Sequence, residues 1–291
     1  MASERLELKA YAKVNLALEV IGRRDDGYHN VATVLQTVDL ADTVVIEEAD
    51  ELSVECDGAG LSGKGNLAWK AAEALAERAG IVPRARIRID KRIPVASGLG
   101  GGSADAAATL VGLNRLWGLE LSEAELEEVA AGLGSDVPFL LTGGTALGTG
   151  RGDEIVRLPR LSAAELLLAV PGDSIDAKTP TMYQALRAED FSDGSRTRGI
   201  ASDLGQRALT SGGCCNAFER AAREIFPGLA DVWDKVAGVT RHPPRLSGAG
   251  PAMFVMPSSE SEHIRVSESL QGSGAAAYLV RAISPSGRNE A

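Results

Sequence analysis

The chain has 291 residues, of which 44% are hydrophobic and 24% are charged, and its formal net charge is −10. Length and composition predict a globular protein with a full core, built as one large domain or as two of ordinary size. The acidic balance disfavours a nucleic-acid partner, because nucleic-acid binding depends on clustered Lys and Arg, but it leaves a nucleotide substrate open.

The cysteines indicate a reducing compartment. Cys56, Cys214 and Cys215 are an odd set with one adjacent pair, which is no disulfide framework. No apolar run reaches the length of a membrane span, and the first residues carry no apolar signal region. We therefore expect a cytoplasmic protein that has no membrane partner.

Residues 5–20 alternate and predict a strand, in which Lys13 and Asn15 share one face. Two interpretations stand side by side. On this segment alone an edge strand with a wet face is the simpler one; the other is a lysine and an asparagine presented together at an active-site wall. Residues 31–40, 43–47 and 52–56 predict further strands of a meander.

A glycine-rich turn ends in Tyr28 and His29. His29 is open to three interpretations: a metal ligand, a stacking partner or a surface residue. The metal interpretation is the weakest, because His242 and His263 lie far away and lack ligand spacing.

Residues 58–65 resemble a phosphate-binding P-loop until Gly65, which stands where Ser or Thr would hold Mg²⁺. We therefore expect a plain loop here. Asn66 is the predicted N-cap of a helix over 67–79, which ends at Gly80.

The most informative segment follows a predicted strand at 85–89. It runs from Pro94 through four glycines into an alanine-rich helix predicted over 102–117. Glycines let several backbone N–H groups converge on one point, and a helix start adds unpaired donors and the positive end of its dipole. The segment predicts an anion site, most often for phosphate, in preference to a tight turn that is merely rich in glycine. It fits neither a Walker A loop nor a dinucleotide fingerprint.

A capping box at Ser122 predicts a helix over 123–133. Asp136 then lies between Gly134 and Pro138. Its side chain is expected either to close an Asx turn or to serve as a carboxylate held on a stiff turn.

We expect a domain boundary near 158–162, which divides the chain into domains 1–158 and 159–283 and a disordered tail, 284–291. Residues 190–205 are polar and contain glycine, as in a mobile loop. A second glycine-rich loop covers 245–251. The other predicted elements are strands at 145–148, 166–170, 252–255 and 276–281, and helices at 178–188, 216–224, 228–237 and 260–270.

Several motifs in this order resemble those of the GHMP small-molecule kinases, and two of them resemble one family of that superfamily, the kinases of 4-diphosphocytidyl-2-C-methyl-D-erythritol. The first of these two is Ala12-Lys13-Val14-Asn15-Leu16, and the second is Asp26-Gly27-Tyr28-His29. The superfamily motifs are the glycine segment from Ile93 to Ala107, Gly134-Ser135-Asp136-Val137-Pro138 and Leu246-Ser247-Gly248-Ala249-Gly250. The resemblance implies an α+β fold of two α/β domains with the active site between them.

The resemblance also implies an activity: transfer of the γ-phosphoryl group of ATP to the 2-hydroxyl of the cytidine substrate, on the non-mevalonate route to isoprenoids. It implies that Lys13 and Asp136 flank the acceptor hydroxyl and that Asn15 fixes the substrate. Tyr28, His29 and Tyr183 are implied to hold the cytosine. The residues implied to hold ATP are Asn66, Leu67, Lys91, Pro94, Val95, Ala96, Ser97, Gly98, Leu99, Gly100, Gly101, Gly102, Ser103 and Ala104. The implied cofactors are ATP, as co-substrate, and Mg²⁺, with Ser103 as the candidate metal ligand.

Two alternatives are kept open. One is another kinase of the superfamily, with a mevalonate-type, homoserine or sugar substrate. Tyr28 and His29 oppose it, because such substrates have no cytosine. The other is a non-catalytic nucleotide- or RNA-binding module, which the acidity and the joint presence of Lys13 and Asp136 oppose. The expected partners are ATP and a small molecule, and the chain is expected to be a monomer or a homodimer.

Overall fold

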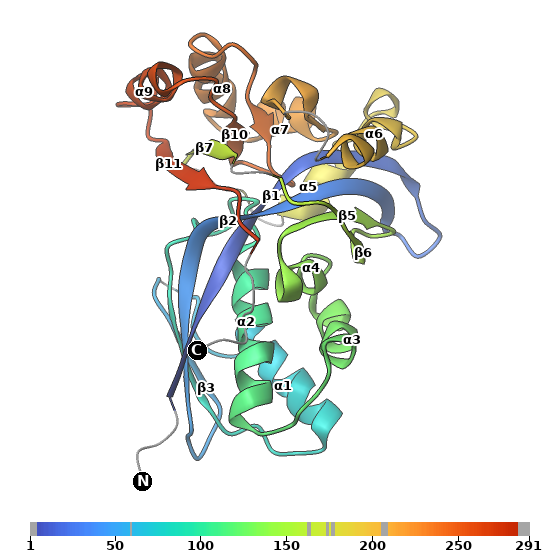
Figure 1. The fold of residues 1–291 in the computed structure, drawn as a ribbon, viewed down its shortest axis with the longest axis vertical. Helices are drawn as coiled ribbons and strands as arrows, with labels where there is room; N and C mark the ends of the chain where they lie inside the picture. The colour runs from blue at the N-terminus through green and yellow to red at the C-terminus, as the bar shows by residue number, and fades with distance from the viewer. Residues whose placement is uncertain are drawn as a thin grey trace.

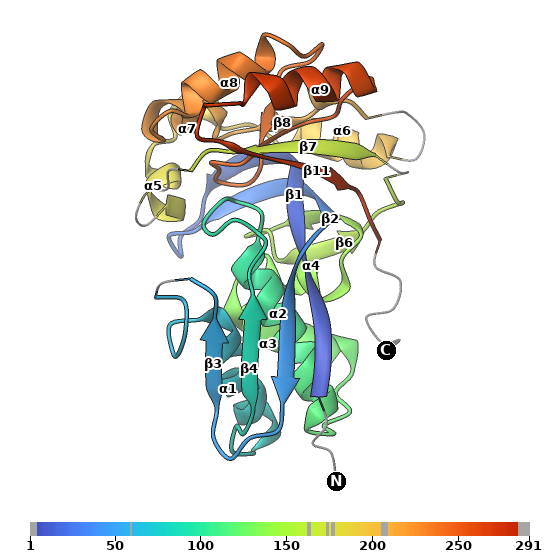
Figure 2. The ribbon, with the colours of Figure 1, turned by 90° about the vertical axis from the view of Figure 1, so that its left-hand side faces the viewer.

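The computed structural model describes residues 5–58, 60–161, 164–172, 175, 178–204 and 209–284. Figures 1 and 2 show two layered parts, one above the other, with the long strands β1 and β2 running through both. The lower part is a sheet backed by α1, α2 and α3, and the upper part is a smaller sheet covered by α8 and α9. The expected tail lies outside the described residues except for Ser284.

Strands and helices are interspersed along the chain, often in runs of two or three of one kind. The strands are β1 (Arg5–Arg23), β2 (His29–Glu47), β3 (Ser53–Cys56), β4 (Arg86–Asp90), β5 (Thr145–Thr149), β6 (Glu154–Arg157), β7 (Glu165–Val170), β8 (Cys215–Asn216), β9 (Arg245–Leu246), β10 (Met253–Val255) and β11 (Ala276–Arg281). The α-helices are α1 (Leu67–Ala79), α2 (Gly101–Leu116), α3 (Glu123–Leu133), α4 (Val137–Thr142), α5 (Lys178–Gln184), α6 (Ser195–Asp203), α7 (Glu219–Ile225), α8 (Leu229–Ala237) and α9 (Glu260–Ser269).

The larger sheet has the strand order β3-β4-β2-β1-β8, with β5 and β6 branching from β2. The predicted meander is wrong, because β4 lies between β2 and β3. β3 pairs with β4 in parallel, and such a pair needs a crossover connection, which α1 supplies.

The wet face that the edge-strand interpretation gave to β1 is wrong, because the strand is buried around Lys13 and Asn15, although β8 pairs with it only at Ala17 and Leu18. β1 pairs with β2 on one side and with β8 on the other. Every residue from 12 to 20 is buried. The β1–β2 register shifts between Tyr11 and Lys13 and again between Asn15 and Ala17. Bulges of this kind bend a strand and re-aim its side chains, and these two flank the polar pair.

Helix α2 packs closely on the lower sheet because its inward face carries small residues. A Cβ on Gly112 would lie 2.4 Å from Cδ1 of Ile46 on β2. Leu110 and Leu113 are fully buried in the same core, and burial of each contributes roughly 1.5–3 kcal/mol to stability. This packing fixes the start of α2, and with it the glycine loop, against β1 and β2.

Local signals placed several helix ends correctly. Asn66 caps α1 through its side chain, Gly80 ends that helix in the left-handed conformation, and Ser122 forms the expected capping box of α3. The expectation of a polar loop over 190–205 is wrong, since it contains α6, whose Thr197 N–H donates to the buried Glu19 carboxylate of β1 at 2.6 Å. The amino-acid composition of the segment cannot predict such a long-range contact.

The upper part contains a four-stranded sheet in the order β11-β7-β10-β9. A second core cluster, which includes Phe218, Trp233 and Met253, lies between elements of this sheet and the helices α7 to α9. The upper part also contributes β8 to the larger sheet, next to β1. The two parts are therefore joined by backbone hydrogen bonds as well as by loops.

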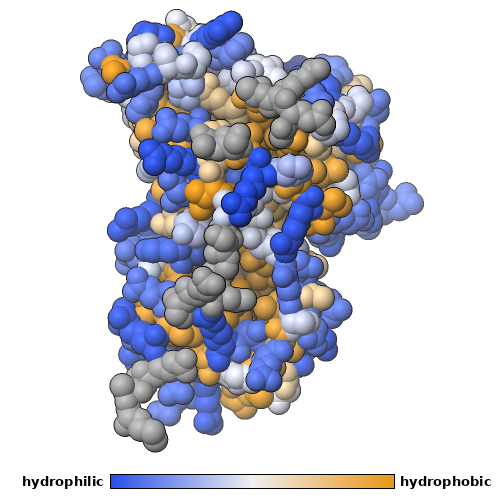
Figure 3. All heavy atoms as spheres, viewed as in Figure 1, coloured by the Kyte–Doolittle hydropathy of each residue, from blue (hydrophilic) through white to orange (hydrophobic). Residues whose placement is uncertain are grey.

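Hydrophilic residues cover most of the face shown in Figure 3, and apolar residues gather toward its middle. Within the described ranges, no helix is both long and apolar enough to cross a membrane.

Candidate active site

Two glycine-rich loops meet at the floor of a cleft. The first loop, residues 94–100, joins β4 to α2, and the second, residues 247–252, joins β9 to β10. Ala252 N donates to the Ser97 carbonyl at 2.8 Å, and the Ser247 hydroxyl donates to the Gly98 carbonyl at 3.2 Å. A Cβ on Gly98 would lie only 2.4 Å from the Ser247 carbonyl oxygen. Glycine at this position is what lets the loops touch.

The cleft above these loops has a volume of about 1210 Å³, enough for a nucleotide and a second substrate together. Most of the predicted site residues line it: Lys13, Asn15, Tyr28, His29, Asn66, Leu67, Lys91, Pro94, Val95, Ala96, Ser97, Gly98, Gly100, Gly101, Gly102, Ser103, Asp136 and Tyr183.

Leu99 and Ala104 are not among the lining residues, and their side chains are fully buried in the core. Leu99 contributes through its backbone, since its carbonyl accepts from Lys13 N at 2.9 Å.

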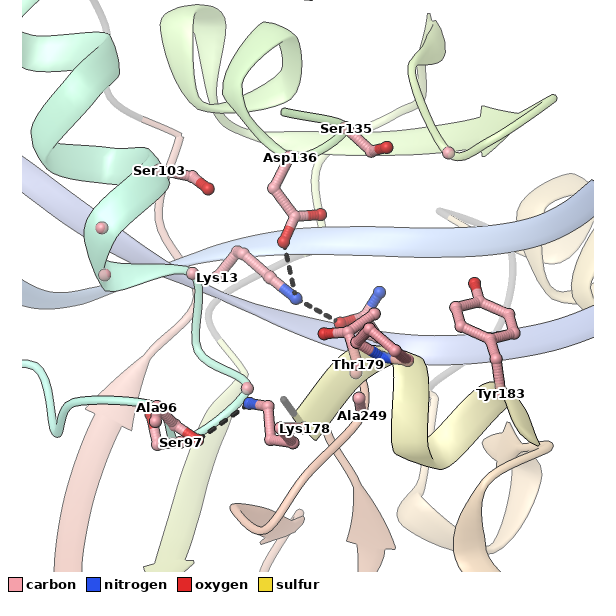
Figure 4. A pocket seen from close by; sticks show the side chains of 18 of the residues that line it. Lys13, Ala96, Ser97, Ser103, Ser135, Asp136, Lys178, Thr179, Tyr183 and Ala249 are labelled. Carbon is pink, nitrogen blue, oxygen red and sulfur yellow. Dashed lines mark hydrogen bonds and ion pairs between the residues drawn. The ribbon is translucent and has the colours of Figure 1, made fainter. Parts of the chain in front are cut away.

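Lys13 is at the centre of the cleft. Its side chain is only 4% exposed, yet its ammonium group has a polar partner on each side. Nζ donates to Asn15 Oδ1 at 2.6 Å and lies 3.3 Å from Asp136 Oδ2 (Figure 4). Gly100 and Gly248 leave room for it, because a Cβ on either would come within 3.0–3.2 Å of the lysine side chain. The geometry aims a buried cation at the space between the two loops.

Asn15 is held in turn by its neighbours. Its Nδ2 donates to Thr33 Oγ1 at 2.8 Å, and the Thr33 hydroxyl donates to the Ala17 carbonyl at 2.7 Å. These two successive hydrogen bonds orient the Asn15 side-chain oxygen toward Lys13. The amide therefore has a single arrangement, which is useful for positioning a ligand.

Asp136 is the residue that precedes α4, with φ −84° and ψ −16°. Its side chain forms no cap hydrogen bond, so the Asx-turn interpretation is not supported. The side chain is 34% exposed and points toward Lys13 (Figure 4). A partly exposed carboxylate beside a buried ammonium can accept a proton from a hydroxyl placed between them.

One end of the cleft is aromatic. The His29 and Tyr183 rings stack with centroids 4.6 Å apart and planes inclined by 15°, and Tyr183 meets Phe218 edge-on. Burial, with a contribution from Arg23, holds the pKa of His29 below its ordinary value, so the imidazole is neutral at pH 7. Burial also raises the pKa of Tyr183 to about 12.

Tyr28 lies at the mouth of this end and is 56% exposed. The Arg151 guanidinium lies 5.0 Å from its ring centroid and forms an ion pair with Asp153. Arg151 lines the cleft, although the sequence analysis did not single it out as a site residue. The exposed ring and its cation offer a flat surface to an aromatic ligand.

The other end of the cleft is lined by Asn66, Leu67 and Lys91. Lys91 Nζ donates to Asp42 at 2.5 Å and to Asp105 at 2.7 Å, so much of its charge is already balanced. Asp42 is also held by two backbone N–H groups, of Arg92 and Ile93. Burial raises the pKa of Asp105 to about 7. This trio of charged groups anchors the segment after β4 and the start of α2 to β2, directly beneath this end of the cleft.

A metal site built by the protein alone is not found, because the described residues contain no group of three or more His, Cys, Asp or Glu side chains that could hold an ion. Mg²⁺ bound with phosphates usually keeps several waters and takes only one or two protein ligands. The Ser103 hydroxyl, which lines the cleft at the start of α2, fits that limited role.

Two polar residues of the site were not foreseen, in addition to Arg151. Ser247 links the loops, and its hydroxyl also accepts from Asn15 N at 3.3 Å. Lys178, the first residue of α5, places its ammonium between the loops (Figure 4). Only Ser247 had a local signal, its place in the second glycine-rich loop. Nothing near Lys178 in the sequence marks it.

Comparison with known proteins first defines the class. A family profile described as "GHMP kinases N terminal domain" matches residues 66–144, which include the glycine loop, α2 and Asp136. A crystal structure of a 4-(cytidine 5'-diphospho)-2C-methyl-D-erythritol kinase superposes with a TM-score of 0.78 at 34% identity, covering 96% of this chain and 100% of that one. The α+β fold is that of a GHMP kinase, an ATP-dependent small-molecule kinase.

The particular family follows from the curated relatives. The 4-diphosphocytidyl-2-C-methyl-D-erythritol kinase of Rhodococcus jostii is 43% identical over 92% of this chain and 88% of its own length. The enzyme of that name from Dehalococcoides mccartyi (strain BAV1) is 37% identical over 96% of this chain and 99% of its own. The chain belongs to the family of 4-diphosphocytidyl-2-C-methyl-D-erythritol kinases, as its Lys13 and Tyr28 motifs predicted.

Proposed function

We propose that the chain transfers the γ-phosphoryl group of ATP to the 2-hydroxyl of 4-diphosphocytidyl-2-C-methyl-D-erythritol, giving the 2-phosphate and ADP in the non-mevalonate route to isoprenoid precursors. The observation that carries the proposal is the Lys13–Asp136 pair, 3.3 Å apart beside the glycine loop. The stacked His29 and Tyr183 rings at one end of the same cleft support the cytidine part of the substrate.

In this proposal the loop residues 94–104 hold the triphosphate through backbone N–H groups and the start of α2. Phosphoryl transfer needs positioning and charge neutralisation more than covalent assistance. Lys13 stabilises negative charge on the acceptor oxygen, and Asp136 accepts the hydroxyl proton. Asn15 keeps the lysine aimed at that oxygen through the bond of 2.6 Å.

Mg²⁺, when bound, neutralises part of the triphosphate charge, and Ser103 is its proposed protein ligand. Asn66, Leu67 and Lys91 line the proposed adenine end. Tyr28, His29 and Tyr183 hold the cytosine, where a neutral imidazole can both donate and accept a hydrogen bond. In this proposal residues 1–158 form the ATP-binding domain, which also supplies Tyr28 and His29, and residues 159–283 form the second domain, which supplies Tyr183.

A coupled assay of ADP release tests the proposal. With purified protein, ATP and Mg²⁺, we expect rapid ADP formation with the cytidine substrate and a background rate without it. Mevalonate and homoserine serve as comparison acceptors, because kinases of the same superfamily act on such alcohols. Faster turnover with either of them than with the cytidine substrate would contradict the proposal.

A further inference from the structure

Lys178 connects the two glycine-rich loops. Its Nζ donates to the carbonyl of Ala96 in the first loop and to that of Gly250 in the second, each at 2.8 Å. It lines the same cleft as Lys13, and Figure 4 shows its ammonium beside the loop that carries Ser97. A lysine has three N–H donors, so these two bonds leave one for a ligand.

The charge of Lys178 is poorly balanced. Its two partners are neutral carbonyls, and within the part of the chain that the structure describes no carboxylate forms a salt bridge with it. The charged groups that act on it are Lys13 of β1, which repels it, and Asp136 before α4, which attracts it but is already paired with Lys13. Burial and the neighbouring Lys13 lower the pKa of Lys178 to about 8.

We infer that Lys178 is a second phosphate-neutralising cation of the active site, held by the two loop carbonyls and completed by the triphosphate of ATP. The inference rests on the proposed function, because it takes the 94–104 loop as the triphosphate site. Ala96 belongs to that loop, so the Lys178 amine lies beside the proposed binding site of the negatively charged triphosphate. Two ammonium groups, Lys13 and Lys178, then share the charge that phosphoryl transfer must neutralise.

A purely structural link between the loops would need the hydrogen bonds but no change in protonation. A phosphate-binding amine behaves differently. At pH 8.5 a pKa of about 8 leaves about three quarters of the amines neutral. Bound triphosphate favours the charged form and raises the pKa of the amine, so ATP binding takes up protons. The phosphate groups are already ionised at this pH and take up none.

Calorimetry of ATP–Mg²⁺ binding at pH 8.5, without the cytidine substrate and in buffers of different ionisation enthalpy, measures this uptake. For the wild-type protein we expect about half a proton or more for each ATP bound. Lys178→Arg keeps a charge that cannot be lost, so it should bind ATP with almost no uptake. Lys178→Met should also show none and should bind about tenfold more weakly. Lys235→Met, which removes an exposed lysine of α8, should match the wild type.

Kinetics supply an independent measurement. Because the protonated amine is the active form, kcat/KM for ATP should fall as pH rises through about 8 in the wild type, and this fall should disappear in Lys178→Arg. If Lys178→Met does not fold, the comparison of wild type with Lys178→Arg decides alone. ATP binding with equal proton uptake in these two proteins would overturn the inference and leave the proposed function intact. A wild-type protein that does not bind ATP would overturn both.

Discussion

Replacing Asp136 with asparagine should lower kcat strongly while changing the free energy of unfolding little. The Asp136 side chain is 34% exposed and forms no cap hydrogen bond, and an isosteric amide can still accept from the Lys13 ammonium, so the substitution should change the free energy of unfolding by about 1 kcal/mol or less. As the proposed general base, however, it should contribute roughly 10²–10⁴ to kcat. At about 1.4 kcal/mol for each factor of ten, that is about 3–5 kcal/mol of transition-state stabilisation, well above the folding effect.

The matched experiment uses three variants: Asp136→Asn, Lys13→Met and the double change. Lys13→Met should also lower kcat, and it carries a folding cost of roughly 1–3 kcal/mol because the buried Asn15 oxygen loses its donor at 2.6 Å. The double variant should lose less than the sum of the single losses, since the two groups act on one hydroxyl. Asp231→Asn, an exposed carboxylate in the first turn of α8, serves as the control and should leave kcat unchanged.

Steady-state kinetics under saturating ATP and cytidine substrate, with thermal unfolding measured on the same preparations, provide the result. A largely dissociative transition state would place the loss at the smaller end of the range, since the acceptor hydroxyl then needs less help. Wild-type kcat in Asp136→Asn would refute the assignment of the base and leave the carboxylate as a partner of Lys13 only.

Three further predictions concern the loops and the aromatic end. Tyr28→Ala should weaken binding of the cytidine substrate by roughly 1–3 kcal/mol through lost stacking and leave ATP affinity nearly unchanged; calorimetry that finds ATP weakened instead would reverse the two ends of the cleft. Gly102→Ala should raise the KM for ATP at unchanged or higher thermal stability, because apart from its chain neighbours and the backbone of its own helix nothing lies within 4 Å of the added Cβ, and Ala favours a helix. Gly98→Ala should instead lower stability, since its Cβ meets the Ser247 carbonyl at 2.4 Å and its φ is +92°. An equal melting-temperature loss in both variants would contradict this distinction. Burial lowers the pKa of His29, so the imidazole takes up its proton below the ordinary value of 6.5. The KM for the cytidine substrate should therefore stay constant from pH 8 to about 6.5 and rise only at lower pH. A rise already above pH 7 would contradict a neutral imidazole.

Sequence reasoning performed best where a physical signal is confined to a few neighbouring residues. The cap at Asn66 and the capping box at Ser122 each depend on a side chain and a backbone N–H no more than three positions away. The glycine segment before α2 is of the same kind, because its conformational freedom and the helix start that follows are both local. The two motifs that distinguish the family were also contiguous, and the comparisons confirm the family they indicated.

The sequence by itself therefore determined many of the local elements, the glycine-rich loop before α2 and the family. Only the tertiary structure decided that β4 separates β2 from β3, that β1 is buried around Lys13, and that the Lys178 amine reaches the Ala96 carbonyl 82 positions away. The physical reason is the range of the interactions. Caps and turns are set by neighbours along the chain, whereas strand order and the burial of a lysine depend on which distant segments pack together. The pKa of Lys178 at about 8 exists only because folding buries the amine and brings it close to Lys13.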